Sequence, residues 1–171
     1  MLAEWHEFYG LLGTAAAALV ALLFVAASIG ANVFTAESAG ATRTFMSPVV
    51  FHYTNILFLS LIALIPTQTW LTFGLTIGIA SIGSIIYSAV ILHRLLHDNI
   101  ADLADRLAYG SVPVLCYAAG LVSAYLLIEQ STAGLDVLAG AALLLLVVNI
   151  RNAWDLMIAL ARKSNERRPK S

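Results

Sequence analysis

The sequence has little charge and almost no cysteine. Only 11% of its 171 residues are charged and 60% are hydrophobic, whereas an ordinary soluble domain carries about 25% charged residues. The single cysteine, Cys116, excludes an intrachain disulfide and a thiolate metal cluster. The chain also lacks the basic, aromatic-rich segments that are typical of nucleic-acid binding. This composition indicates a polytopic membrane protein.

Motifs of catalysis are also absent. The sequence has no GxSxG, GxGxxG, P-loop or HExxH pattern. His93 and His97 have the spacing of a metal-binding pair on a helix, but no third ligand accompanies them on the same face. We therefore expect a non-enzymatic protein with no metal site.

The chain does contain five long apolar stretches. A bilayer core of about 30 Å needs about 20 apolar residues as helix, because backbone groups cannot be left unpaired in lipid. The sequence therefore predicts an all-α membrane bundle of five transmembrane helices, the second opened by Pro48 and stopped before Pro66. The expected spans are residues 8–33, 48–64, 70–92, 112–128 and 136–160.

The basic residues test this count, because short cytoplasmic loops collect Lys and Arg. Five spans with a cytoplasmic C-terminus place all nine basic residues on one side of the membrane. A four-span arrangement scatters them across both sides. We therefore expect the N-terminus outside and the C-terminus in the cytoplasm.

The segment between the third and fourth spans is too polar to cross a membrane. Leu96, Ile100, Leu103 and Leu107 repeat at helical spacing among charged residues, which predicts a short amphipathic cytoplasmic helix over about 94–108. Residues 1–163 would then form a single transmembrane domain, followed by a basic cytoplasmic tail over 164–171.

Polar residues of the spans gather toward their predicted cytoplasmic ends. The outer halves are mostly Leu, Ala, Val and Ile, so these residues predict a common polar layer that lines a cavity in the inner leaflet and handles charge. The residues assigned to this layer are His52, Asn55, Tyr87, Ser88, Asn149, Arg151, Asn152 and Asp155.

Arg151 and Asp155 are the charged members of this layer. They are four residues apart, which allows an ion pair on a helix. An unpaired charge inside the bilayer costs about 3 kcal/mol on insertion scales. Two interpretations stay open: the pair serves a wet cavity, or Arg151 reaches the headgroups and the pair only fixes the depth of the helix.

The histidines allow two further hypotheses. His52 is either a packed core histidine or a proton relay, since imidazole titrates near neutral pH. His52 and His93 both lie toward the cytoplasmic side, so a haem ligated between them is an alternative. No other feature of the sequence indicates haem binding.

Small residues recur at helical spacing in three spans. Such faces let helix backbones approach closely. We predict that they pack the helices of the bundle against one another, with a seam between copies of the chain as the alternative. The residues concerned are Gly13, Gly74, Gly78, Ser81, Ser84 and Gly120.

Two segments carry a resemblance to other proteins. WHEFYGLLGTAAAALVALLFVAASIG in the first span and NAWDL in the last resemble a group of small bacterial integral membrane proteins. The resemblance implies a multi-pass protein of the bacterial inner membrane. It implies no catalytic or ligand-binding residue.

Two classes of function follow. The first is an oligomeric small channel or transport component with a polar cavity in the inner leaflet. The alternative is an accessory protein that binds another membrane protein through its small-residue faces. The expected partners are the lipid bilayer and either a second copy or another membrane protein, and not nucleic acid.

Overall fold

The computed structural model describes residues 3–29, 39–97 and 106–166, and these ranges are almost wholly helical. The long helices are α1 (His6–Ile29), α2 (Ala39–Ala63), α3 (Trp70–His97), α5 (Val112–Ile128) and α6 (Ala133–Glu166). A short 3₁₀-helix, η1 (Ala3–Trp5), precedes α1, and a short π-helix, η4 (Arg106–Ser111), precedes α5. The prediction of an all-α bundle is confirmed.

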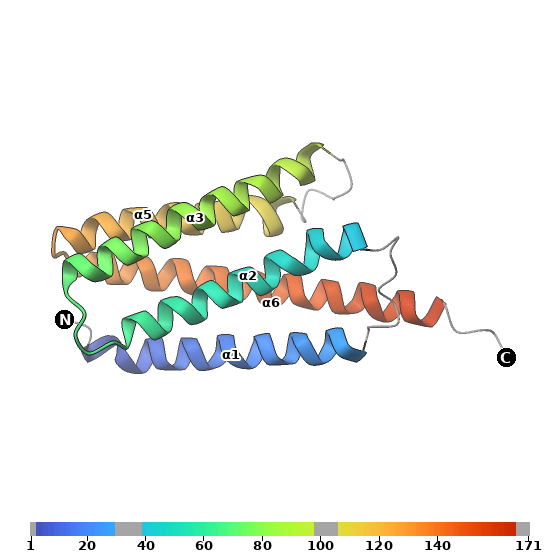
Figure 1. Ribbon diagram of the computed structural model, residues 1–171, viewed down its shortest axis with the longest axis horizontal. Helices are drawn as coiled ribbons and strands as arrows, with labels where there is room; N and C mark the ends of the chain where they lie inside the picture. Colours follow the sequence, from blue (N-terminus) through green and yellow to red (C-terminus); the bar gives the residue numbers. More distant parts are fainter. Residues whose placement is uncertain (1–2, 30–38, 98–105, 167–171) are drawn as a thin grey trace.

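The five long helices run along one common axis (Figure 1). We call the end at which α1, α3 and α6 begin the N-terminal end of the bundle, and the opposite end the C-terminal end. α2 and α5 run from the C-terminal end back to the N-terminal end. α5 packs extensively against α3 and α6, and α2 packs against α1 and α6, whereas α2 and α3 touch each other little.

Four of the helical segments are long and apolar enough to cross a membrane. They are His6–Ser28, Trp70–His97, Leu107–Ile128 and Ala133–Ile158. The apolar part of α2 is shorter, at Ser47–Ala63. The structure therefore supports a multi-pass membrane protein with four candidate spans, one fewer than the five that the sequence predicts.

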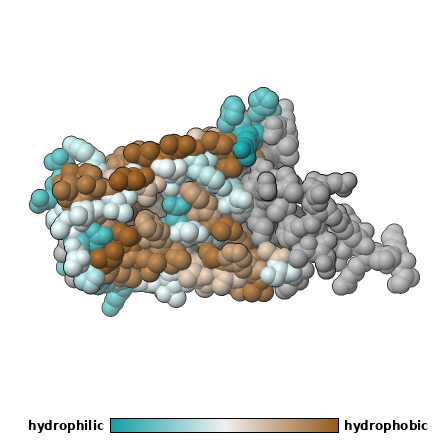
Figure 2. All heavy atoms as spheres, in the orientation of Figure 1, coloured by the Kyte–Doolittle hydropathy of each residue, from teal (hydrophilic) through white to brown (hydrophobic). Residues whose placement is uncertain are grey.

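The surface agrees with a membrane environment. Apolar side chains cover much of the bundle between its ends, and many of the hydrophilic residues gather near the ends (Figure 2). Large apolar residues such as Leu11, Ile79 and Leu115 are more than half exposed. Lipid chains tolerate such a surface, which water does not favour.

Several predicted boundaries are corrected. α2 begins at Ala39, nine residues before Pro48, because a helix in apolar surroundings tolerates the lost proline hydrogen bond. α3 continues to His97 rather than ending near Leu92, which places the first residues of the predicted amphipathic helix in α3. α6 starts at Ala133 and continues to Glu166, into the predicted tail.

Other parts of these predictions lie outside the described residues. They are residues 30–33 of the first span, 98–105 of the amphipathic helix and 167–171 of the tail. α5 has the bounds predicted for the fourth span, but the apolar segment long enough to cross a membrane begins earlier, at Leu107, within the predicted amphipathic helix.

Two turns at the N-terminal end fix how the helices connect. Thr69 caps α3: its Oγ1 accepts from the Thr72 backbone N–H at 3.2 Å, and the Thr72 hydroxyl accepts from the Thr69 N–H at 3.0 Å. Between α5 and α6, Gln130 has a φ of 58°. The N–H of Ser131 donates to the Leu126 carbonyl at 2.9 Å, which is the hydrogen bond of a Schellman turn.

Candidate functional site

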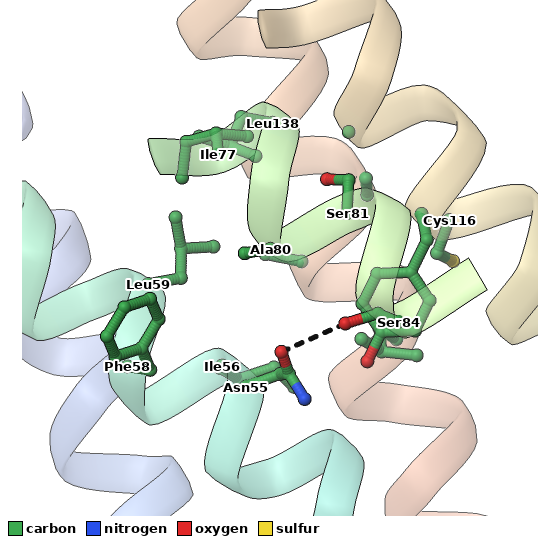
Figure 3. A pocket seen from close by; sticks show the side chains of 15 residues that line it. Asn55, Ile56, Phe58, Leu59, Ile77, Ala80, Ser81, Ser84, Cys116 and Leu138 are labelled. Carbon is green, nitrogen blue, oxygen red and sulfur yellow. Dashed lines mark hydrogen bonds between the residues drawn. The ribbon is translucent and has the colours of Figure 1, made fainter. Parts of the chain in front are cut away.

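A cavity of about 60 Å³ lies inside the bundle, among four helices. α2 and α3 form its two sides, and α5 and α6 form its back wall (Figure 3). A buried water molecule needs about 10–15 Å³ of cavity volume, so the cavity has room for about four water molecules. The lining residues are Asn55, Ile56, Phe58, Leu59, Ile77, Ala80, Ser81, Ser84, Cys116, Tyr117, Gly120, Leu138, Ala141, Ala142 and Leu145.

Two hydrogen bonds tie α2 to its neighbours at this cavity. The Ser84 hydroxyl donates to Asn55 Oδ1 at 3.1 Å and joins α3 to α2 (Figure 3). The His52 Nδ1 and the Tyr117 hydroxyl lie 2.8 Å apart and join α2 to α5. Two hydrogen-bonded pairs of side chains thus join three helices at the cavity.

A layer of buried polar side chains lies next to the cavity, toward the C-terminal end. Residues four apart share a helix face, so His52 lies one turn from Ile56, Ser88 one turn from Ser84, and Asn149 one turn from Leu145. The second residue of each pair lines the cavity. The predicted layer of eight residues is thus reduced to three, and from here on the polar layer means His52, Ser88 and Asn149 alone.

The polar layer is buried, and part of it has no partner. Its three side chains are at most 1% exposed. Among the described residues, His52 Nε2, Ser88 Oγ and both polar atoms of the Asn149 side chain have no hydrogen-bond partner. Leaving such a group unpaired costs about 1–3 kcal/mol. Tyr9, Tyr53 and Asn152 also each have one buried polar atom without a partner, but the three residues of the layer lie one turn from the cavity, which indicates a place for small polar molecules.

Arg151 and Asp155 do not belong to this layer. They form the ion pair that their spacing predicts, with Arg151 Nη2 and Asp155 Oδ2 3.4 Å apart. Their side chains are 47% and 42% exposed, because positions 149 and 152 turn the other face of α6 inward. The interpretation that the pair sets the depth of α6 fits this placement.

The two remaining predicted polar residues have local partners. Tyr87 packs its ring on Phe51 of α2, with ring centroids 4.0 Å apart. Asn152 is fully buried and donates through Nδ2 to the Ala108 carbonyl at 3.1 Å. The Tyr109 hydroxyl donates to the Asn152 carbonyl at 2.8 Å. Asn152 thus anchors η4 to α6.

The histidines do not face a common space. His93 is exposed and its ring lies against that of His97, at 6.1 Å between centroids, whereas His52 is buried and bonded to Tyr117. The placement does not favour a haem between His52 and His93. The described residues hold no group of three His, Cys, Asp or Glu side chains that could bind a metal ion.

The predicted small-residue faces are used inside the chain. A Cβ added to Gly74 would lie 2.8 Å from Ile128 Cγ1 and 3.0 Å from the Ala124 carbonyl oxygen of α5. One added to Gly120 would lie 2.5 Å from Ser81 Oγ, and one added to Gly13 would lie 2.9 Å from Ser60 Cβ. These contacts support the expectation that small residues pack α3 on α5 and α1 on α2.

Two tyrosines that the sequence does not single out as site residues matter here. Tyr117 provides the partner of His52, and Tyr109 provides the hydroxyl that reaches Asn152. The available signal for Tyr117 was its depth, since it lies one turn into the fourth span, level with the predicted polar layer. Tyr109 lies in a segment expected to be cytoplasmic, and no pattern predicts its contact with α6.

Comparisons with known proteins add no relative to this description. No protein-family model, no curated protein and no solved structure matches the chain.

Proposed function

We propose that the chain is a non-enzymatic transport component of the membrane, in which the polar layer holds water and passes protons toward the cavity. The unpartnered polar atoms of His52, Ser88 and Asn149 carry this proposal. In an apolar bundle these atoms gain hydrogen bonds only from water or a solute. His52 contributes an imidazole, whose unpartnered Nε2 can accept or donate a hydrogen bond according to its tautomer.

The proposal includes α2 as a fifth crossing. α1 and α3 both run from the N-terminal end to the C-terminal end (Figure 1). If both cross the membrane, the chain must return between them, and α2 makes that return along the bundle. Its apolar part, Ser47–Ala63, is 17 residues long, or about 26 Å at the helical rise. That length is close to the thickness of the bilayer core.

Transport through a single bundle would require movement of helices. On the N-terminal side of the cavity the core is close-packed and mostly apolar, with Phe73, Leu127 and Leu135 at most 1% exposed. Gly74 lies directly against α5 there. A carrier that opens to one side at a time fits these contacts better than an open channel, unless several copies enclose a path between them.

The orientation and the bacterial inner membrane are part of the same proposal. Arg94 lies in the last turn of α3, Arg106 begins η4, and Arg162 and Lys163 lie near the end of α6, all at the C-terminal end of the bundle (Figure 1). The positive-inside rule then places this end in the cytoplasm. The polar layer would lie in the cytoplasmic half of the membrane.

The accessory function has less support from the contacts. The glycine and serine faces that would bind a partner are occupied within the chain, as Gly74, Gly120 and Gly13 show. A partner would have to use another surface.

The test is proton flux into liposomes that contain the purified protein and an entrapped pH-sensitive dye, driven by a potassium gradient with valinomycin. We expect flux above that of empty liposomes, and a loss of at least tenfold for Asn149→Leu. Arg151→Gln is the matched control on the same helix, and its flux should be unchanged because Arg151 is half-exposed outside the layer. Circular dichroism checks that both variants are folded. Wild-type flux equal to that of empty liposomes would contradict the proposal.

A further inference from the structure

The mouth of the cavity lies between two helices and not at an end of the bundle. The cavity residues Asn55, Phe58 and Leu59 belong to α2, and Ala80 and Ser84 belong to α3. In Figure 3, Phe58 and Leu59 of α2 lie on one side of the cavity and Ala80 of α3 lies across from them. α2 and α3 touch little along their length, so the opening between them is not closed by helix packing.

This mouth faces lipid. Phe58 is 45% exposed, and Leu59 and Ala80 are half-buried at the rim. On α3 the neighbouring outward residues are apolar too, with Ile79 and Ile82 both more than half exposed. α3 is one of the candidate spans, so acyl chains surround this surface. A molecule that reaches the mouth from this side must therefore be dissolved in the bilayer.

The interior selects for an uncharged hydrogen-bonding group. Its polar side chains are Asn55, Ser81, Ser84 and Tyr117, and none of its lining residues carries a charge. The rest of the lining is apolar, including Ile77, Leu138 and Leu145. A charged group would be left unpaired here at a cost of several kcal/mol, whereas a hydroxyl or carbonyl finds donors and acceptors.

We propose that this cavity binds the head of a membrane-dissolved amphiphile with a small uncharged head, such as an alcohol or a carbonyl, which enters sideways between α2 and α3. The volume of about 60 Å³ admits the head and the first carbons of a chain, while the tail stays among the lipids at Phe58 and Ala80. Ser84, Asn55 and Tyr117 then bond the head, next to the polar layer.

The only cysteine of the chain offers a direct test, because Cys116 lines the back of the cavity. In nanodiscs, both faces of the membrane are open to the solution. We expect the uncharged, lipid-soluble N-ethylmaleimide to modify Cys116 at least tenfold faster than a charged methanethiosulfonate. Each rate is divided by a reference rate, which is the rate at which the same reagent modifies an exposed cysteine. The reference cysteine lies in the α5–α6 turn of a Cys116→Ala, Gln130→Cys variant. Dodecanol in the nanodisc should slow the N-ethylmaleimide reaction at Cys116.

A matched pair of variants tests the route. Ala80→Phe should block the mouth and slow the modification of Cys116 at least fivefold. Ala89→Phe makes the same change at an exposed position of α3 that is not part of the cavity lining, and it should leave the rate unchanged. A long-chain alcohol with a diazirine beside its hydroxyl gives a readout that does not depend on thiol ionisation, with crosslinks expected on cavity residues of α3 and α5.

Several results would overturn the inference. Equal normalised rates for the charged and uncharged reagents would mean access from water. A rate that Ala80→Phe does not change would exclude the route between α2 and α3. No modification of Cys116 together with no crosslink in the cavity would mean that the cavity is closed. This binding is tested separately from transport: protection by dodecanol without proton flux would keep the inference and contradict the proposed function.

Discussion

At the scale of single residues, burial separates side chains that look alike in the sequence. NIRNAWD places four polar residues within seven positions of α6, and a helix turns two of them inward and two outward. Asn149 and Asn152 are at most 1% exposed, while Arg151 and Asp155 pair with each other on the outer face. The charged residues attract attention first in the sequence, but the two asparagines are the ones that lie in the core.

Asn152 is expected to be needed for stability. Replacing it with Leu removes its hydrogen bond to the Ala108 carbonyl and leaves that buried acceptor unpaired, at a cost of about 1–3 kcal/mol. We expect the free energy of unfolding of the purified protein, measured with a denaturing detergent, to fall by that amount. The control is Arg151→Gln, one position away and half-exposed, for which we expect a change below about 0.5 kcal/mol. Equal effects of the two variants would show that the contact with η4 contributes nothing.

The pair of His52 and Tyr117 is expected to be energetically coupled. Tyr117→Phe leaves the His52 Nδ1 without its partner. His52→Leu likewise leaves the Tyr117 hydroxyl without its partner. The double variant removes both groups and should cost less than the sum of the single variants, with a coupling of about 0.5–3 kcal/mol. The same unfolding measurement on the wild type, the two single variants and the double variant completes this double-mutant cycle. Additive losses would mean that the 2.8 Å contact is not a stabilising hydrogen bond.

At the scale of elements, the structure and the sequence agree where hydropathy alone decides. α5 has the bounds that its apolar run predicts, and the helices begin and end near recognisable signals such as the Thr69 cap. The predictions fail where charge or proline would end a helix in water but does not end it here. α2 extends past Pro48, and α3 continues through Arg94 to His97.

The sequence also predicts only part of the candidate site. The depth of the polar residues in their spans predicts the layer that contains His52, Ser88 and Asn149. Polar residues occur on several faces of α6, and depth alone does not tell which face is turned inward, so the sequence groups Arg151 and Asp155 with Asn149. The sequence predicts a cavity among the polar residues, but neither its position nor its lining, because these depend on how far α2 stands from α3.

The two glycines of GxxxG in α3 are expected to behave differently. A Cβ at Gly74 would meet the α5 backbone at 3.0 Å, whereas one at Gly78 would lie 3.5 Å from Ala124 Cβ, an ordinary contact. We expect Gly74→Ala to destabilise the protein by about 1–3 kcal/mol through overpacking. Gly78→Ala should be neutral or slightly stabilising, because alanine favours helix by up to about 1 kcal/mol. Detergent-induced unfolding measures both, and equal losses would contradict the close approach at Gly74.

At the scale of the whole molecule, the direction of the helices bears on how the chain crosses the membrane. Glu4, the α2–α3 loop at Thr67 and the α5–α6 turn at Gln130 all belong to the N-terminal end of the bundle (Figure 1). They carry no Lys or Arg between them, while the opposite end contains Arg94 at the end of α3. The molecule is therefore asymmetric in charge along the axis that we take as the membrane normal.

This asymmetry gives a prediction about topology that can distinguish four crossings from five. In a Cys116→Ala background, single cysteines at Glu4, Thr67 and Gln130 should all react with a membrane-impermeant maleimide added outside intact cells, because five crossings place all three outside. If α2 lies along the surface instead of crossing, Glu4 and Thr67 must fall on opposite sides and only one of them will react. Labelling of all three only after the cells are opened would keep five crossings but reverse the orientation. That result would place the polar layer in the outer half of the membrane, against the positive-inside rule.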